Sequence, residues 1–125
     1  MRTVSSIWDG GYRCRVRVRD FELVVDEPVD VGGTDTGPRP TEMMLSAVAS
    51  CFTLAIAHVA RKHDKPLTDL EVQAFGEYNG PRFSKIWVVA SSGLPKEDLL
   101  WLADRASRVC YVSNSLACEF EYTVA

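Results

Sequence analysis

The sequence lacks several patterns that would assign it to a function directly. No pair of its four cysteines has CxxC spacing, so neither a zinc site nor a thioredoxin-like redox motif is indicated. It contains no GxGxxG and no Walker pattern, which leaves a nucleotide phosphate loop without support. It also lacks an excess of positive charge, because 14 Lys and Arg face 17 Asp and Glu, for a net charge of -3. A nucleic-acid partner is therefore not expected.

Signals for export and for a second domain are missing as well. The N-terminus has one early arginine, Arg2, but no apolar core followed by a small-residue cleavage site. We therefore expect the protein in the cytoplasm, where thiols are normally kept reduced. A length of 125 residues is typical of one domain, and no repeat or composition shift marks a boundary. The expectation is a single domain over residues 1–125.

The N-terminal part of the chain predicts short β-strands. Residues 12–19, YRCRVRVR, alternate strictly between one apolar and one basic face, which is typical of a half-buried strand. The apolar run FELVV at 21–25 predicts a second strand, joined to the first by a tight turn at Asp20. Residues 3–8 predict a short strand before these two. The Pro- and Gly-rich residues 26–40 then predict a loop.

The rest of the chain predicts helices and strands in alternation. The expected elements are a long helix from Pro40 or Thr41 to about His63, strands over 69–78 and 83–91, a helix from Pro95 to Cys110, and a strand over 119–124. The resulting order is βββ-α-ββ-α-β. This order favours an α+β fold with helices over antiparallel sheet.

The long helix carries no Asp, Glu, Lys or Arg from Met43 to Ala60. That length is sufficient to span a bilayer, but Ser46, Ser50 and Thr53 lower its hydrophobicity, so we expect no membrane partner. A helix that is apolar on nearly all sides should be buried on nearly all sides. One sheet of so short a chain covers only part of it, which predicts a homodimer with this helix at or near the interface. The alternative is a monomer with a deep core.

Cys51 lies in the middle of this uncharged helix. The ordinary interpretation of each cysteine, including Cys14, Cys110 and Cys118, is a small buried apolar side chain. A functional thiol at Cys51 requires a nearby cation or hydrogen-bond donor to become a thiolate at neutral pH. The helix dipole contributes little, because Cys51 lies about ten residues beyond the N-terminus of the helix.

Two stretches of the sequence carry a family resemblance. The stretch VDEPVDVGGTDTGPRPTEMMLSAVASC, which ends at Cys51, resembles the signature of the OsmC/Ohr family, the osmotically inducible and organic-hydroperoxide-resistance proteins. The stretch ASRVCYVSNSL, which contains Cys110, is similar to the second cysteine motif of that family. The pattern resembles the broader OsmC-like branch more than a typical organic hydroperoxide resistance protein.

The resemblance implies a fold and an activity. The fold would be an intertwined homodimer, with antiparallel sheets around a long buried central helix and two active sites at the subunit interface. The activity would be that of a cysteine-based peroxidase, an oxidoreductase that reduces organic hydroperoxides in oxidative-stress defence. Cys51 would be the peroxidatic cysteine and Cys110 the resolving cysteine. A dithiol reductant, of the lipoyl type in this family, would restore the thiols, and no metal or organic cofactor is implied.

The resemblance also implies an arginine, held by a glutamate, that stabilises the thiolate. Arg13 is the first candidate and Arg15 the second, although four alternating arginines are also typical of a solvated strand face. Glu42 is the candidate glutamate. It lies nine residues before Cys51, about half a turn out of phase on a regular helix. Two roles remain open for it, an approach to the partner's site or service at the helix N-terminus.

Two further functions compete with the peroxidase hypothesis. One is a non-enzymatic dimer of the same fold that binds a small apolar ligand or senses oxidants. The uncertain arginine and the displaced glutamate favour it somewhat. The other is an acyl-transfer enzyme with Cys51 as nucleophile, which ranks last because no general base is placed near that residue in the sequence.

Overall fold

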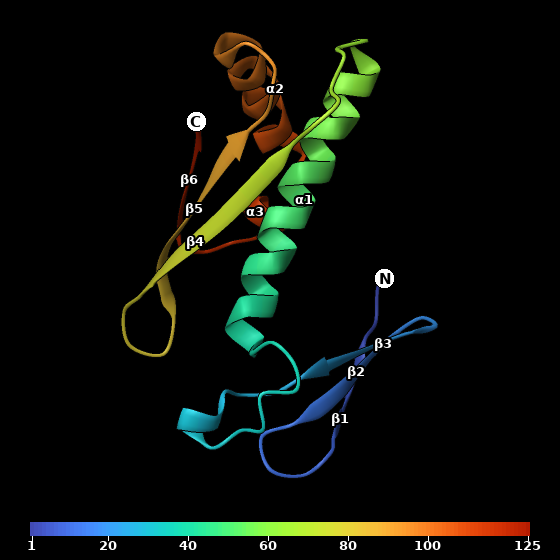
Figure 1. Cartoon of the computed structure of the whole chain (residues 1–125), viewed down its shortest axis with the longest axis vertical. Coiled ribbons are helices and arrows are strands. Elements are labelled where there is room, and N and C mark those ends of the chain that lie inside the picture. The colour runs from blue at the N-terminus through green and yellow to red at the C-terminus, as the bar shows by residue number, and fades with distance from the viewer. The chain divides into compact units, whose positions relative to one another are not determined.

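The computed structural model describes all residues from Met1 to Ala125 and divides into two compact units, Met1–Met44 and Leu45–Ala125. The elements in chain order are β1 (Ser5–Trp8), β2 (Cys14–Val18), β3 (Phe21–Val25), the 3-10 turn η1 (Val29–Val31), α1 (Pro40–Lys62), β4 (Glu71–Tyr78), β5 (Phe83–Ser91), α2 (Lys96–Val109), α3 (Tyr111–Asn114) and β6 (Glu119–Val124) (Figure 1). The predicted α+β class and the order βββ-α-ββ-α-β are confirmed. The single domain over 1–125 stays a prediction.

The N-terminal unit is built on a three-stranded antiparallel sheet in the order β1-β2-β3. Val16 pairs with Ser6 on one side and with Leu23 on the other, so the apolar residues of β2 and β3 share one face. This face has little cover, because Trp8 is 75% exposed and Phe21 is 60% exposed. A three-stranded sheet with one bare apolar face does not by itself make a core.

The loop after β3 is organised by one buried carboxylate, that of Asp26. Its oxygens accept the backbone N–H groups of Glu27 (2.7 Å), Thr34 (3.3 Å) and Thr36 (3.1 Å), and the hydroxyls of both threonines. The two hydroxyl bonds are the main reason why the pKa of Asp26 lies well below its usual range. Gly33 allows the close approach that this loop needs, because a Cβ there would lie 1.8 Å from the Glu27 carbonyl oxygen.

The C-terminal unit contains a second three-stranded sheet in the order β4-β5-β6. β4 and β5 form the predicted antiparallel hairpin, whereas β5 and β6 pair in parallel, with Ile86 opposite Phe120. The expectation of purely antiparallel sheets is therefore wrong for this pair. The physical reason is the connection: the chain crosses through α2 and α3 between β5 and β6, and such a helical crossover returns the next strand in the same direction.

The core of the C-terminal unit lies between this sheet, α1 and α2 (Figure 1). Alternate residues of β5 point into it, and Ile86, Val88 and Ala90 are fully buried. Phe52 of α1 and Leu102 of α2 meet them and have no exposed area. The buried positions of both helices recur at three- and four-residue spacing, which explains why each helix packs along one side.

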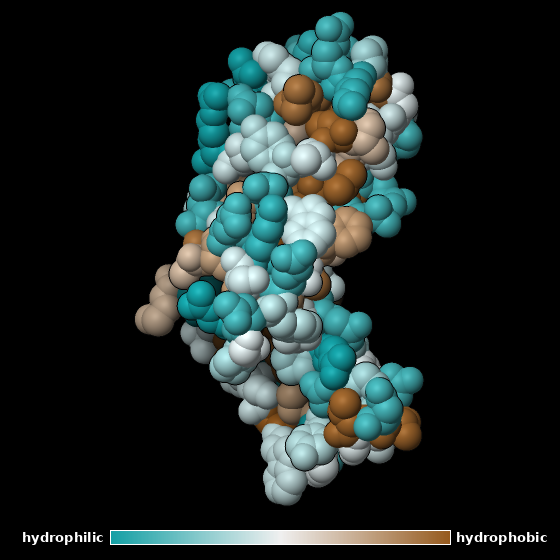
Figure 2. Space-filling model, turned by 90° about the vertical axis from the view of Figure 1, so that its left-hand side faces the viewer, coloured by the Kyte–Doolittle hydropathy of each residue, from teal (hydrophilic) through white to brown (hydrophobic).

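The side of α1 away from the core is exposed within one chain. Leu54 is 68% exposed and His58 is also exposed, and 28% of the most apolar 18-residue window of the helix is buried. The expected burial on nearly all sides is therefore not found within one chain, because a single sheet covers one side of a helix only. By length and composition alone, this is the one helix that could cross a membrane. Apolar side chains also reach the surface of each unit (Figure 2).

Candidate active site

Cys51 lies in the middle of α1, at the border between the buried and the exposed side of the helix. Its immediate neighbour Phe52 is fully buried, whereas Ser50 is exposed. The Cys51 side chain is half-buried and packs against the core of the C-terminal unit. This position combines contact with the protein interior and access from outside, which a thiol that reacts with a small molecule requires.

Cys110 lies at the junction between α2 and α3. It has an extended backbone (φ -78, ψ 104), which ends α2 and begins α3 one residue later. Its side chain belongs to the core and has no exposed area. The break between the two helices therefore directs this thiol inward rather than to the surface.

The structure brings Cys51 and Cys110 together. Cys110 belongs to the core against which Cys51 packs, Cys51 is near enough to raise the pKa of Cys110, and both thiols are free. Burial raises the pKa of the Cys110 thiol, the hydroxyl and backbone N–H of Ser113 lower it, and the neighbouring Cys51 raises it further. The arrangement is a pair of reduced cysteines, one accessible and one enclosed, that can form a disulfide when the first is oxidised.

Arg13 lies just before β2, in the N-terminal unit. Its Nε is 3.1 Å from the Asp9 carboxylate, and its Nη1 donates to the Thr36 hydroxyl at 3.2 Å. Arg15, the second candidate, has longer ion pairs, 4.0 Å to Asp9 and 3.7 Å to Glu22. Arg13 is thus the more firmly held of the two within this unit. A role for either side chain in thiolate stabilisation stays a prediction.

Glu42 serves the N-terminus of α1, which is one of its two predicted roles. Its Oε1 accepts the backbone N–H of Arg39 at 3.0 Å, in the manner of a capping interaction. In the N-terminal unit, the arginine and glutamate that form two hydrogen bonds with each other are not the predicted ones. Arg39 donates from Nε (3.1 Å) and Nη2 (2.9 Å) to one carboxylate oxygen of Glu27. Sequence reasoning missed this pair because it searched only the arginine-rich strand, although both residues lie in the stretch that carries the resemblance.

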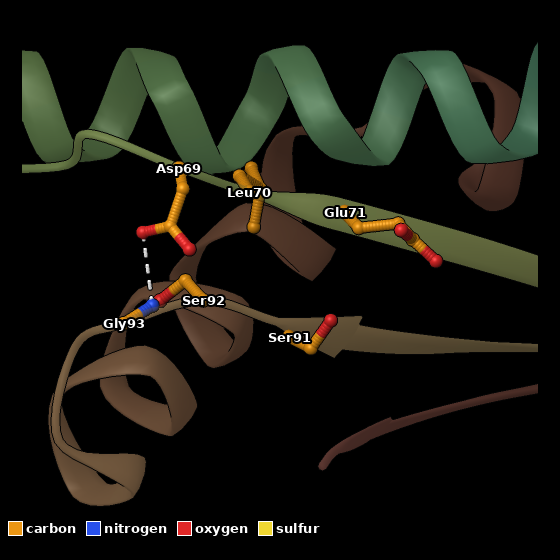
Figure 3. Close-up of a pocket in the computed structure, with 6 residues that line it drawn as sticks. All are labelled: Asp69, Leu70, Glu71, Ser91, Ser92 and Gly93. Atoms are coloured by element: carbon orange, nitrogen blue, oxygen red, sulfur yellow. Dashed lines mark hydrogen bonds between the residues drawn. The ribbon is translucent and has the colours of Figure 1, made fainter.

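The C-terminal unit also has a hollow away from the two thiols. It measures about 430 Å³ and is lined by residues at the ends of β4 and β5 and in the turns beside them, namely Asp69, Leu70, Glu71, Ser91, Ser92 and Gly93 (Figure 3). Asp69 accepts the backbone N–H of Gly93 at 2.9 Å, which ties the two turns together. No cysteine lines this hollow, so the cysteine pair is the stronger candidate for redox chemistry. No group of three or more His, Cys, Asp or Glu is arranged to hold a metal.

Comparisons with known proteins agree with this fold. The model of the family described as OsmC-like protein matches residues 33–124. The chain is 25% identical over 125 residues to an uncharacterised protein of Haloferax volcanii, covering 96% of this chain and 90% of that one.

Two solved structures share the fold over nearly the whole chain. One is an organic hydroperoxide resistance protein, OsmC, of Legionella pneumophila, with TM-score 0.78 and 23% identity, covering 100% of this chain and 98% of that one. The other is an OsmC-like protein of Mycoplasma pneumoniae, with TM-score 0.86 and 14% identity, covering 100% and 96%. The family match spans most of the chain and includes both cysteines that the fold brings together. The chain belongs to the OsmC-like protein family.

Proposed function

We propose that this protein is a thiol-dependent peroxidase that reduces organic hydroperoxides in oxidative-stress defence. The observation that carries the proposal is the meeting of the half-buried Cys51 with the enclosed Cys110, both as free thiols. Family membership adds support, since relatives in this family are described as organic hydroperoxide resistance proteins. We expect the reaction to take place in the cytoplasm, where reductants keep the pair in its dithiol form.

The proposed reaction follows from the accessible position of Cys51 and the enclosed position of Cys110. The Cys51 thiolate attacks the distal oxygen of the hydroperoxide, the O–O bond breaks, and the alkoxide leaves and takes up a proton to become the alcohol. Cys51 is then a sulfenic acid. Cys110 attacks its sulfur, and water leaves as the disulfide forms, which protects Cys51 from further oxidation. A dithiol, in this family of the lipoyl type, then exchanges with the disulfide and restores both thiols.

The test adds one equivalent of an organic hydroperoxide to the reduced protein, followed by a rapid quench and peptide mapping of disulfides. We expect a Cys51–Cys110 bridge to form quickly. Two unchanged thiols would contradict the proposal. The other two cysteines, Cys14 and Cys118, are half-buried and serve as internal controls that should stay reduced.

We also propose that the active form is a homodimer, in which a second copy covers the apolar surface that one chain leaves bare. Leu54 on α1 is 68% exposed, and Phe21 on the N-terminal sheet is 60% exposed. Large apolar side chains exposed on a helix and on a sheet are typical of an interface between copies. Sedimentation should give twice the mass of the chain, and Leu54→Lys should shift the protein toward monomers. A wild-type monomer at all concentrations would contradict this proposal.

A second candidate function is that of a non-enzymatic dimer that binds a small apolar ligand or senses oxidants. Two observations favour it. Burial keeps the pKa of Cys110 above its usual value, and Glu42 is engaged at the N-terminus of α1. A sensor would form the same disulfide once but would not turn over with an added dithiol. Steady consumption of hydroperoxide with dihydrolipoamide therefore separates the two functions.

A further inference from the structure

One face of the C-terminal sheet points away from the core. Ile86, Val88 and Ala90 of β5 are buried, so the residues between them and their partners on β4 and β6 lie on the opposite face. The strand register arranges these side chains in four rows across the sheet, two residues apart along each strand. We call this surface the outer face, and all of its side chains are exposed or half-buried. Its rows are Glu77, Lys85 and Glu119; Phe75, Trp87 and Glu121; Gln73, Val89 and Thr123; and Glu71 and Ser91.

The centre of the outer face is a stacked pair of aromatic rings. The ring centroids of Phe75 and Trp87 are 5.4 Å apart, and the ring planes differ by 13°. Phe75 is 39% exposed and Trp87 is half-buried, so solvent reaches the pair. The Lys85 ammonium lies 5.8 Å from the centroid of Trp87, within the range of a cation–π contact. The two rings therefore form a platform on which a cationic side chain can lie.

The outer face also has an excess of negative charge. Its four carboxylates, those of Glu71, Glu77, Glu119 and Glu121, are accompanied by one ammonium, that of Lys85. Glu121 binds this ammonium at 3.0 Å, whereas the other three carboxylates form no ion pair. Glu121, with smaller contributions from Glu119 and Glu77, raises the pKa of Lys85. A surface of this charge attracts cations and repels phosphate groups, which disfavours nucleic acids and anionic membranes as its occupants.

The hollow of about 430 Å³ lies at one end of the outer face, because Glu71 and Ser91 belong both to its lining and to the last row (Figure 3). Asp69 adds a second carboxylate, which accepts the backbone N–H of Gly93 with Oδ1. No lysine or arginine lines the hollow. Carboxylate and hydroxyl oxygens accept the several N–H groups of an ammonium or a guanidinium. The hollow therefore fits the end of a basic side chain.

We propose that the outer face binds a basic, extended segment of a partner protein. Neighbouring rows are about 6.6 Å apart, which is the spacing of alternate side chains in an extended peptide. A segment that lies along the strands places basic residues at its first and seventh positions, beside Glu77 and in the hollow at Glu71. A basic residue at its third position lies on the aromatic pair, and an apolar residue at its fifth position contacts Val89. This docking is separate from the thiol chemistry and does not rest on the proposed peroxidase function.

The first test titrates the reduced, isotope-labelled protein with a synthetic seven-residue peptide at low salt and follows the indole N–H signals by NMR. The peptide has lysine at its first and seventh positions, arginine at the third, valine at the fifth and serine between them. It should shift the Trp87 signal to saturation and leave the Trp101 signal unchanged, and added salt should weaken its binding. Equal shifts with a peptide that has glutamate at the three basic positions, or no shift with either peptide, would overturn the inference.

The second test compares two variants that lose the same single negative charge. Glu71→Gln changes the outer face at the hollow, whereas Glu97→Gln changes an exposed residue in the first turn of α2. Glu71→Gln should weaken binding of the basic peptide about two- to fivefold, and Glu97→Gln should leave it nearly unchanged. Trp87→Leu removes the aromatic platform and should weaken binding by a similar factor. Equal affinities of Glu71→Gln and Glu97→Gln would show that net charge alone attracts the peptide and would overturn the inference.

A dilution series separates a peptide partner from a second copy of this chain on the same face. The Trp87 signal of the protein alone should not change with protein concentration. A signal that changes with concentration, together with loss of peptide binding at high concentration, would mean that another copy covers the outer face, and the inference would be wrong. Because none of these measurements uses a hydroperoxide, their outcome is independent of whether the cysteine pair turns over.

Discussion

The two units of this protein are held together by different forces. The N-terminal unit has Val25 as its one buried apolar side chain and is organised by polar contacts, chiefly those of Asp26. The C-terminal unit has a continuous apolar core, and the thiol pair comes from α1 and from the α2–α3 junction that border it. The two cysteines thus lie in the unit whose backbone is fixed by apolar packing. The loop after β3, which is held by the hydrogen bonds of Asp26, fixes the local path of the chain in the other unit.

The largest effect should come from the accessible thiol of the C-terminal unit. Cys51→Ser removes the nucleophile, so hydroperoxide consumption should fall to the background rate. Cys118→Ser changes a half-buried cysteine of the same unit and should retain most of the activity. A coupled assay with a dithiol reductant measures both variants. Full turnover in Cys51→Ser would place the chemistry elsewhere.

The next effect compares two phenylalanines, one in each unit. Phe52→Ala empties a fully buried site and should lower the free energy of unfolding by about 3–5 kcal/mol, measured by denaturant unfolding. Phe21→Ala changes a side chain that is 60% exposed and should cost less. If the proposed dimer covers this face, Phe21→Ala should also lower the dimer fraction in sedimentation. An equal loss of stability from both changes would contradict the view that the C-terminal unit has an apolar core and the N-terminal unit does not.

A smaller and more local effect should follow from Asp26→Asn. The amide retains one acceptor but loses the charge, so the loop over 27–38 should open more often, with faster hydrogen exchange at Thr34 and Thr36. Because folding lowers the pKa of Asp26, its contribution is present above the usual Asp pKa and is lost as the pH falls. Acid should therefore speed loop opening in the wild type and have little effect in the variant. The same pH dependence in both proteins would show that another group is responsible.

The smallest effect should come from Tyr122 on β6. Its hydroxyl donates to the Asp104 carboxylate of α2 at 2.8 Å, and this contact raises the pKa of the phenol. Tyr122→Phe should lower the free energy of unfolding by about 1 kcal/mol, because one hydrogen bond is lost. Tyr111→Phe is the matched control, since that side chain is 86% exposed. A null result for Tyr122→Phe would mean that water replaces this contact fully.

Much of the fold was predictable from local patterns. The alternation in residues 12–19 and the apolar run at 21–25 predicted two strands and the tight turn between them, and the structure contains this hairpin. Local patterns predict which elements form, since side-chain period and turn residues act within a few positions. They do not predict how β6 joins its sheet. The parallel pairing of β5 with β6 depends on the crossover through α2 and α3.

For the candidate site as well, the sequence determined some features and the tertiary structure determined the others. The sequence alone marked Cys51 and Cys110 through two motifs, and it determined the apolar, uncharged character of the helix that carries Cys51. Only the tertiary structure decided that the two thiols meet and that Cys110 is enclosed. The physical reason is that a thiol's protonation and partners depend on burial and hydrogen bonds. These come from segments distant in the sequence, and no local pattern records them.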